Sequence, residues 1–214
     1  MLLRRLGLVL IFWLCGVTAV LADKRVALLL AAEDYDFVRP LANPANDARA
    51  LEEVLEGLDF EVFVETNRDL KRTRRALEDF KEDARGADVA LLFFAGHGVA
   101  LDGVNYLLPT DADASSAARL AETSLPLSEA QEAIRAVAPV AIILLDACRD
   151  DPFSGGGKEG RGAAALDDAP PDAPKPQSGL GRIGRADGVL FAFSAAPNET
   201  ASDGDEKNSP FTAA

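Results

Sequence analysis

Length, composition and charge limit the classes of protein to which this chain can belong. Its 214 residues suffice for one domain with a full hydrophobic core or at most two small ones, and 48% hydrophobic with 27% charged residues is typical of a globular protein. The formal net charge of -13 argues against binding to nucleic acid, whose phosphates require a basic surface, and favours cationic partners or simple solubility.

The first 22 residues predict an export signal. Arg4 and Arg5 precede an apolar run over residues 6–21, and Val20-Leu21-Ala22 has the small-residue pattern of a cleavage site. The run is slightly short for a membrane span, so an N-terminal membrane anchor is the alternative. We expect an exported protein, periplasmic or secreted, without stable membrane association once the signal is removed.

Cleavage after Ala22 would also leave a single cysteine. Cys15 lies in the removed segment, and Cys148 is the other cysteine of the chain. No intrachain disulfide is then expected, although the compartment would allow one. A lone thiol in an oxidising compartment is a liability unless it is buried or useful, which favours a functional role for Cys148.

Strands and helices alternate along the chain after residue 23. Apolar runs predict strands at residues 25–32, 60–65, 89–95, 140–145 and 189–194. Amphipathic patterns predict helices over residues 44–57, 70–86 and 128–139, of which the last starts with a capping box of Ser128 and Gln131. Residues 103–109 predict a hairpin or edge segment, and residues 111–116 a polar loop. This order predicts an α/β three-layer sandwich, with a mostly parallel central sheet flanked by helices.

The predicted strands and linkers divide the chain into four parts. Residues 1–22 form the signal peptide, and residues 23–153 form the large region that carries the histidine and the cysteine. Residues 154–188 are rich in Gly and Pro, which predicts a flexible linker. Residues 189–214 begin a smaller segment. Its last residues read as the first turn of a helix that is cut short, so we expect the C-terminal part of the fold to be incomplete.

A histidine and a cysteine follow two of the predicted core strands. Ala95-Gly96-His97-Gly98 places the only histidine of the chain in a turn between two glycines, and Asp146-Ala147-Cys148 follows the strand at 140–145. The carboxyl ends of parallel strands bring such groups to one edge of a sheet. Taken alone, each residue has a structural alternative, since a lone cysteine is usually a small buried hydrophobe. Together they are typical of a thiol nucleophile and its acid/base partner.

These motifs resemble those of caspase-like cysteine peptidases, and specifically of bacterial metacaspase-type members. The matching segments are residues 25–32, 41–48, 93–98, 144–149, 193–203 and 209–211. The resemblance covers nearly all of the chain from Lys24 onward. His97 and Cys148 are about 50 residues apart, the separation that holds for caspases. The resemblance implies a caspase-like fold and a cysteine endopeptidase.

The residues around the cysteine depart from the caspase signature. That signature has Gln two positions before the cysteine, where this chain has Asp146. An aspartate there is what metacaspase-type enzymes carry, and it implies an acidic pocket for Arg or Lys in the substrate. By the same resemblance Asp47 and Asp146 are the candidate pocket acids, with Asp203 a third. The alternative for Asp47 is an ordinary acid in the first turn of a helix, where the dipole favours it.

The resemblance also implies the chemistry. Cys148 would attack the peptide carbonyl, and His97 would protonate the leaving amine and then activate water. The backbone N–H groups of Gly98 and Cys148 are the candidate oxyanion donors. No cofactor and no metal site are expected. Some relatives require calcium, but the available acids do not have the spacing of an EF-hand; these acids are Asp111, Asp113, Asp150 and Asp151.

The expected function is therefore that of a cysteine-type endopeptidase that cleaves polypeptide substrates after Arg or Lys. Two alternatives stay open at this point. The first is a caspase-like module that binds partners without turnover, and the second is another cysteine hydrolase on the same fold.

Overall fold

The computed structural model describes residues 23–148, 177–178, 180–181, 183, 187–194 and 207–214. The predicted signal peptide, most of the predicted linker, and Asp203 lie outside these ranges. Within them, no helix is long and apolar enough to cross a membrane.

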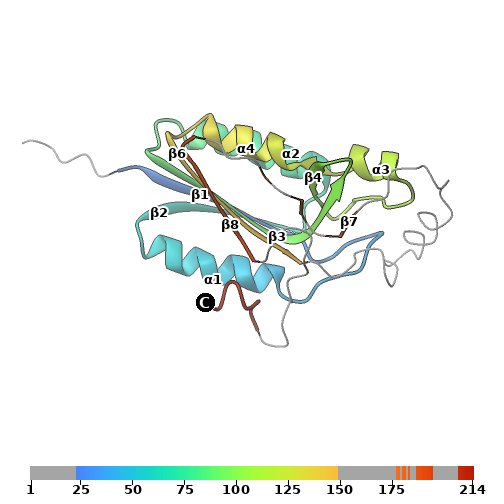
Figure 1. Cartoon of the computed structure of the whole chain (residues 1–214). Helices are drawn as coiled ribbons and strands as arrows, with labels where there is room; N and C mark the ends of the chain where they lie inside the picture. Colours follow the sequence, from blue (N-terminus) through green and yellow to red (C-terminus); the bar gives the residue numbers. More distant parts are fainter. Residues whose placement is uncertain (1–22, 149–176, 179, 182, 184–186, 195–206) are drawn as a thin grey trace, which may run out of the picture.

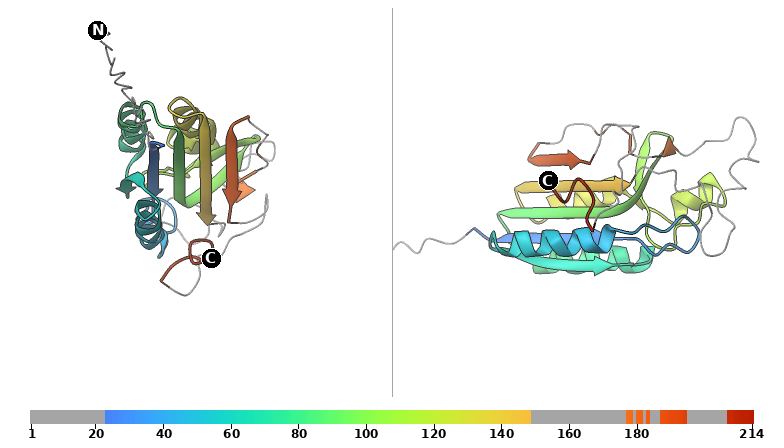
Figure 2. Two further views of the ribbon diagram at one scale, coloured as in Figure 1. Left: turned by 90° about the vertical axis from the view of Figure 1, so that its left-hand side faces the viewer. Right: turned by 90° about the horizontal axis from the view of Figure 1, so that it is seen from below.

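A parallel sheet forms the centre of the molecule (Figure 1). Its strands are β1 (Arg25–Ala31), β2 (Phe60–Thr66), β3 (Val89–Leu101), β6 (Val140–Cys148) and β8 (Val189–Phe193). They lie in the order β2-β1-β3-β6-β8, and every neighbouring pair in this series is parallel. Figure 2 shows β1, β3, β6 and β8 side by side in its left view. All of them coincide with predicted strands.

Helices cover both faces of this sheet. Helix α1 (Pro44–Glu56) lies on one face, and α2 (Leu70–Asp83) and α4 (Leu127–Arg135) lie on the other (Figures 1 and 2). The residues of β1 alternate between two hydrophobic clusters: Leu28 packs with residues of α2 and α4, and Leu29 with residues of α1. Since β1 is buried on both faces, its sequence is continuously apolar. The predicted three-layer α/β sandwich is confirmed.

The strand that carries His97 belongs to two sheets. Beyond the parallel sheet β3 continues to Leu101 and pairs antiparallel with β4 (Val104–Leu107) and β7 (Gln177–Ser178), while β4 pairs with β5 (Leu125–Pro126). The predicted turn at His97 is therefore wrong. Parallel pairing with β6 extends as far as His97, and antiparallel pairing with β4 begins at Gly98, so the backbone stays extended through both glycines.

The helix starts differ in how well the sequence predicts them. Helix α1 starts at Pro44 directly after the N-cap Asn43, as predicted. Helix α4 starts at Leu127 after Pro126, so Ser128 lies inside the helix and the predicted capping box is wrong. A short helix, α3 (Ala117–Glu122), directly follows the predicted polar loop and is absent from the prediction.

The end of the predicted linker is packed against the fold. Gln177 and Ser178 form β7 on the edge of β3, and the side chain of Leu180 is only 5% exposed within the main hydrophobic cluster. The side chain of Asn105 holds the backbone of Gly181 from both sides: Gly181 N–H donates to Oδ1 at 2.6 Å, and Nδ2 donates to the Gly181 carbonyl at 3.3 Å. The prediction of a flexible linker does not apply to these residues.

Candidate active site

The sheet places the backbone positions of His97 and Cys148 side by side. In the parallel register of β3 and β6 the last aligned pair is His97 with Cys148, which is also the last residue of β6. Neighbouring strands lie about 4.8 Å apart. The two residues that the sequence singles out, about 50 positions apart, therefore meet at the carboxyl end of the parallel sheet.

The imidazole of His97 is held inside the protein. The residue is fully buried, and its Nε2 lies 2.7 Å from the carbonyl oxygen of Arg39, in the loop between β1 and α1. In the tautomer that carries the proton on Nε2, this contact is a hydrogen bond to the carbonyl. In this tautomer Nδ1 is the ring nitrogen that carries no proton. No orienting group for the histidine can be predicted from the sequence, because a backbone carbonyl has no signature there.

The two candidate pocket acids converge on one serine. Asp47 belongs to the first turn of α1 and Asp146 to β6, and their exposed fractions are 1% and 2%. The backbone N–H of Ser209 donates to Asp47 Oδ1 at 2.9 Å, and its hydroxyl donates to Asp146 Oδ2. Phe211 from the same C-terminal turn packs into the cluster under α1, and Figure 1 shows this turn beside α1. The structure thus brings together Asp47 and Asp146, while Asp203 lies outside the described residues.

Gly98 directly follows the histidine at a point of close packing. A Cβ atom built on Gly98 would lie 2.9 Å from Leu180 Cδ2 and 3.0 Å from the Cβ of Ala147. Ala147 precedes Cys148 on β6. Glycine is favoured here, because a side chain would require Leu180 or Ala147 to shift.

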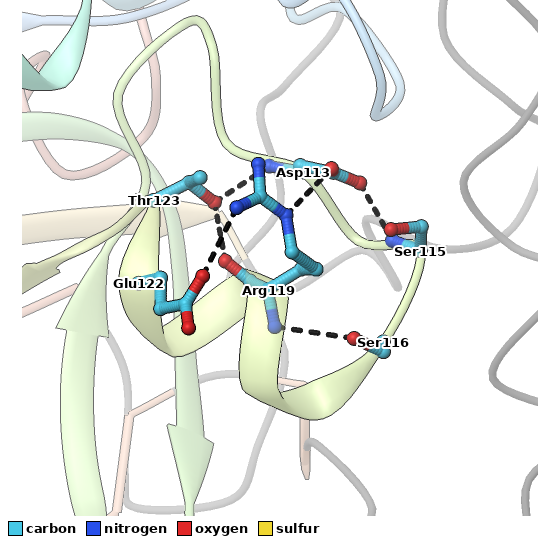
Figure 3. A network of polar contacts seen from close by, with 6 residues as sticks. All are labelled: Asp113, Ser115, Ser116, Arg119, Glu122 and Thr123. Atoms are coloured by element: carbon cyan, nitrogen blue, oxygen red, sulfur yellow. Dashed lines mark hydrogen bonds and ion pairs between the residues drawn. The ribbon is translucent and has the colours of Figure 1, made fainter.

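Asp113, one of the acids considered for calcium, takes part in a local network at the start of α3 (Figure 3). Its carboxylate accepts hydrogen bonds from Ser115 N–H at 2.9 Å and Arg119 Nε at 3.3 Å, and Arg119 also pairs with Glu122. Burial opposes ionisation of Asp113, but these hydrogen bonds and the charge of Arg119 outweigh it and lower the pKa of the carboxyl. These contacts give Asp113 a structural role at the start of α3.

Asp111 has the opposite shift. Its Oδ1 accepts a hydrogen bond from the backbone N–H of Leu70 at 2.8 Å, at the start of α2. Burial raises the pKa of Asp111 by more than this bond lowers it, and the negative charges of Asp69 and Asp36 add to the rise. Among the residues that the structure describes, no group of three or more His, Cys, Asp or Glu residues could hold a metal ion. Asp150 and Asp151 lie outside the described residues.

The fold and the register of His97 with Cys148 place the molecule in the class of caspase-like α/β sandwiches. The family model Peptidase_C14, described as the caspase domain, matches residues 24–214. The chain therefore belongs to the caspase-domain family of cysteine peptidases, and the family named from the motifs is confirmed.

Comparison with individual proteins adds little to this assignment. No curated protein matches the chain. Among solved structures, the chain is similar to protein GSU0716 from Geobacter sulfurreducens, with 15% identity and a TM-score of 0.47. The alignment covers 59% of this chain and 51% of that protein, so the chain spans about half the length of the matched structure.

Proposed function

We propose that this protein is a cysteine endopeptidase that uses Cys148 as its nucleophile and His97 as its acid/base group. The observation that carries the proposal is the register of β3 and β6, which aligns these two positions at the carboxyl end of the sheet. Two groups that must exchange a proton need to be within hydrogen-bond reach of each other or of one shared substrate atom. The alignment of the two backbone positions on adjacent strands supports such an exchange.

The proposed reaction has two halves. The thiolate of Cys148 attacks the carbonyl carbon of the peptide, and the carbon–nitrogen bond then breaks while His97 gives a proton to the leaving amine. The acyl group stays on sulfur as a thioester. His97 next removes a proton from water, the hydroxide attacks the thioester, and the carboxylic acid leaves as the thiolate of Cys148 and the protonated His97 are restored. The N–H groups of Gly98 and Cys148 would stabilise the oxyanion in both halves.

The Arg39 carbonyl supports the role of the histidine. A hydrogen bond from Nε2 fixes the plane of the ring and directs the exchange of protons to Nδ1. The imidazolium formed during the reaction keeps this bond and gains strength from it, because a hydrogen bond from a charged donor is stronger than one from a neutral donor.

For the specificity we propose cleavage after Arg or Lys. Asp47 and Asp146 are buried carboxylates that approach each other from α1 and β6 through Ser209. A cationic side chain from the substrate would compensate charges held in such a place, whereas an acidic one would be repelled. Asp203 is a third candidate. The proposed partners are polypeptides with basic residues, and the proposed reaction uses no cofactor. The N-terminal signal motif supports a site of action in the periplasm or outside the cell.

The test is cleavage of fluorogenic peptides that end in Arg, Lys or Asp by the full chain, with and without calcium. We expect cleavage after Arg and Lys, and none by Cys148→Ala. Asp146→Asn should lower kcat/KM for the Arg peptide by about 30-fold or more, which corresponds to roughly 2 kcal/mol for a desolvated ion pair. Asp113→Asn, which removes an equal charge from the α3 network, is the matched control and should change kcat/KM little.

Each alternative has its own outcome. No cleavage of any peptide by folded protein would favour a binding module without turnover. Hydrolysis of a thioester or ester substrate, without cleavage of any peptide, would favour another cysteine hydrolase. Preference for the Asp peptide would refute the acidic pocket.

A further inference from the structure

We infer that Tyr35 is a positioning residue that holds His97 in place for catalysis; this rests on the proposed role of His97. Tyr35 is fully buried in the loop between β1 and α1. Its hydroxyl accepts a hydrogen bond from the backbone N–H of His97 at 2.8 Å and donates one to the carbonyl of Leu108 at 3.2 Å. The carbonyl of His97 in turn accepts from the N–H of Leu108 at 3.0 Å. The phenol hydroxyl thus closes a ring of hydrogen bonds around the backbone of the histidine.

The hydroxyl of Tyr35 accepts the backbone hydrogen bond that a neighbouring strand would otherwise accept from β3 at this point. β1 pairs with β3 as far as Ala95, and the N–H of Ala32 still donates to the Ala95 carbonyl at 2.9 Å. In a strand, every second residue directs its backbone polar groups to the same side, so those of His97 face the same side as those of Ala95. β1 has ended there, and the Tyr35 hydroxyl receives the His97 N–H instead. The backbone of His97 is therefore held although it lies two residues beyond Ala95, the last residue of β3 that pairs with β1.

The same loop also holds the imidazole. The rings of Tyr35 and His97 have centroids 4.8 Å apart and planes tilted by 40°, which is a packing distance for aromatic rings. Arg39, four residues further along the loop, supplies the carbonyl that contacts Nε2. Since Tyr35 anchors the loop to β3 through its hydroxyl, it also helps to place this carbonyl. Both the backbone and the ring of His97 therefore depend on one loop.

Gly96 makes the contact possible. A Cβ atom on this residue would lie 2.8 Å from the Tyr35 hydroxyl oxygen and 2.8 Å from Phe94 Cζ, a distance that requires something to move. The glycine before the histidine thus leaves the space that the hydroxyl occupies. Gly96, His97 and Tyr35 act as one unit, although Tyr35 lies 62 residues from the histidine in sequence.

The variant that tests this is Tyr35→Phe, which keeps the ring and removes the hydroxyl. Its matched control is Tyr106→Phe, which removes the same atom from the only other tyrosine of the chain. For the Arg peptide we expect kcat to fall about tenfold to a hundredfold, because displacements of about 1 Å at a catalytic group have such effects. KM should stay within about twofold, since the acids that would bind the substrate are unchanged. The control should leave both constants near those of the original protein.

A second readout separates positioning from general loss of stability. In a Cys15→Ser background, Cys148 is the only thiol, and the rate of its alkylation by iodoacetamide against pH reports thiolate formation. A displaced imidazole stabilises the thiolate less, so the midpoint for Tyr35→Phe should lie about one pH unit higher than for the parent. Gly96→Ala displaces the hydroxyl from the other side and should move the midpoint in the same direction. All rates are compared below the unfolding transition of each variant.

The outcomes for the two proposals can be told apart. A midpoint that Tyr35→Phe leaves unchanged would overturn the positioning role, whether or not peptides are cleaved. An original protein that cleaves no peptide would refute the proposed function, and the alkylation profile would still decide on Tyr35. A raised midpoint with reduced kcat supports both.

Discussion

The hydroxyl of Ser209 provides a sharp test of how the two candidate pocket acids are held. Ser209 is 1% exposed and donates through its hydroxyl to Asp146, which is 2% exposed. A hydrogen bond to a charged group contributes about 1.5–3 kcal/mol to stability, and a buried carboxylate that loses a donor costs the protein a similar amount. We therefore expect Ser209→Ala to lower the free energy of unfolding by about 2 kcal/mol. The bond from its backbone N–H to Asp47 is kept in this variant.

The matched control is Ser124→Ala. Ser124 is fully buried, and among the described residues its hydroxyl has no hydrogen-bond partner. A buried hydroxyl without a partner is destabilising, so its removal should leave stability unchanged or raise it by up to about 1 kcal/mol. The two variants lose the same atom from equally buried serines. The difference between their effects isolates the hydrogen bond to Asp146 from the loss of volume.

Urea and thermal unfolding measure this difference. For a protein of this size, 2 kcal/mol corresponds to a fall in Tm of roughly 4–8 °C. The two variants should therefore be clearly separated, with Ser209→Ala the less stable. Equal unfolding free energies for both variants would refute the reasoning. Because Ser209 also places the acids of the proposed pocket, its loss should raise KM for the Arg peptide more than it lowers kcat. An unchanged KM would assign the serine a structural role alone.

Two further predictions concern a shifted pKa and a close contact. Since burial raises the pKa of Asp111, its ionised form costs the folded state free energy at neutral pH, so Asp111→Asn should raise Tm at pH 7. The gain should shrink as pH falls towards about 4 and disappear below about pH 3, where the carboxyl is protonated in the unfolded state as well. A gain that keeps its full size below about pH 3 would contradict this assignment. Gly98→Ala should destabilise the protein, and should do so less in a Leu180→Ala background, because Leu180 is the nearest obstacle to a new Cβ; strictly additive Tm changes would show that Leu180 is not the cause.

The sequence predicts the parallel sheet and its helices well, because each of these elements buries a recognisable apolar pattern. The sequence predicts less well a strand whose extent depends on pairing with residues far away along the chain. His97 lies in a stretch rich in glycine, which locally favours a turn, yet pairing with β6 and then with β4 keeps it extended. The partner residues come from far along the chain, so no local pattern predicts the continuation. The same holds for Gln177 and Ser178, whose strand exists only against β3.

The candidate site shows a similar division. His97, Cys148, Asp47 and Asp146 carry side-chain chemistry that a motif can reveal. The contacts that hold them are not predicted. One partner is a backbone carbonyl, and Ser209, although it lies in one of the matching segments, is 162 residues from one acid and 63 from the other. Tyr35 offers one usable signal. A tyrosine in an apolar environment needs a partner for its hydroxyl, so a buried tyrosine next to a predicted site is a candidate for a supporting contact.

The placement of His97 where two sheets meet has a physical consequence for the site. A histidine at a free strand end would depend on a loop for its geometry, and loops have the lowest local stability in a fold. Here β3 continues for four residues beyond the histidine, the Tyr35 hydroxyl binds its backbone N–H, and the Arg39 carbonyl contacts its ring. The position of the imidazole is therefore set by strand pairing and by one anchored loop. Substitutions in this loop should act on the reaction through distance and orientation, even where they remove no charge from the site.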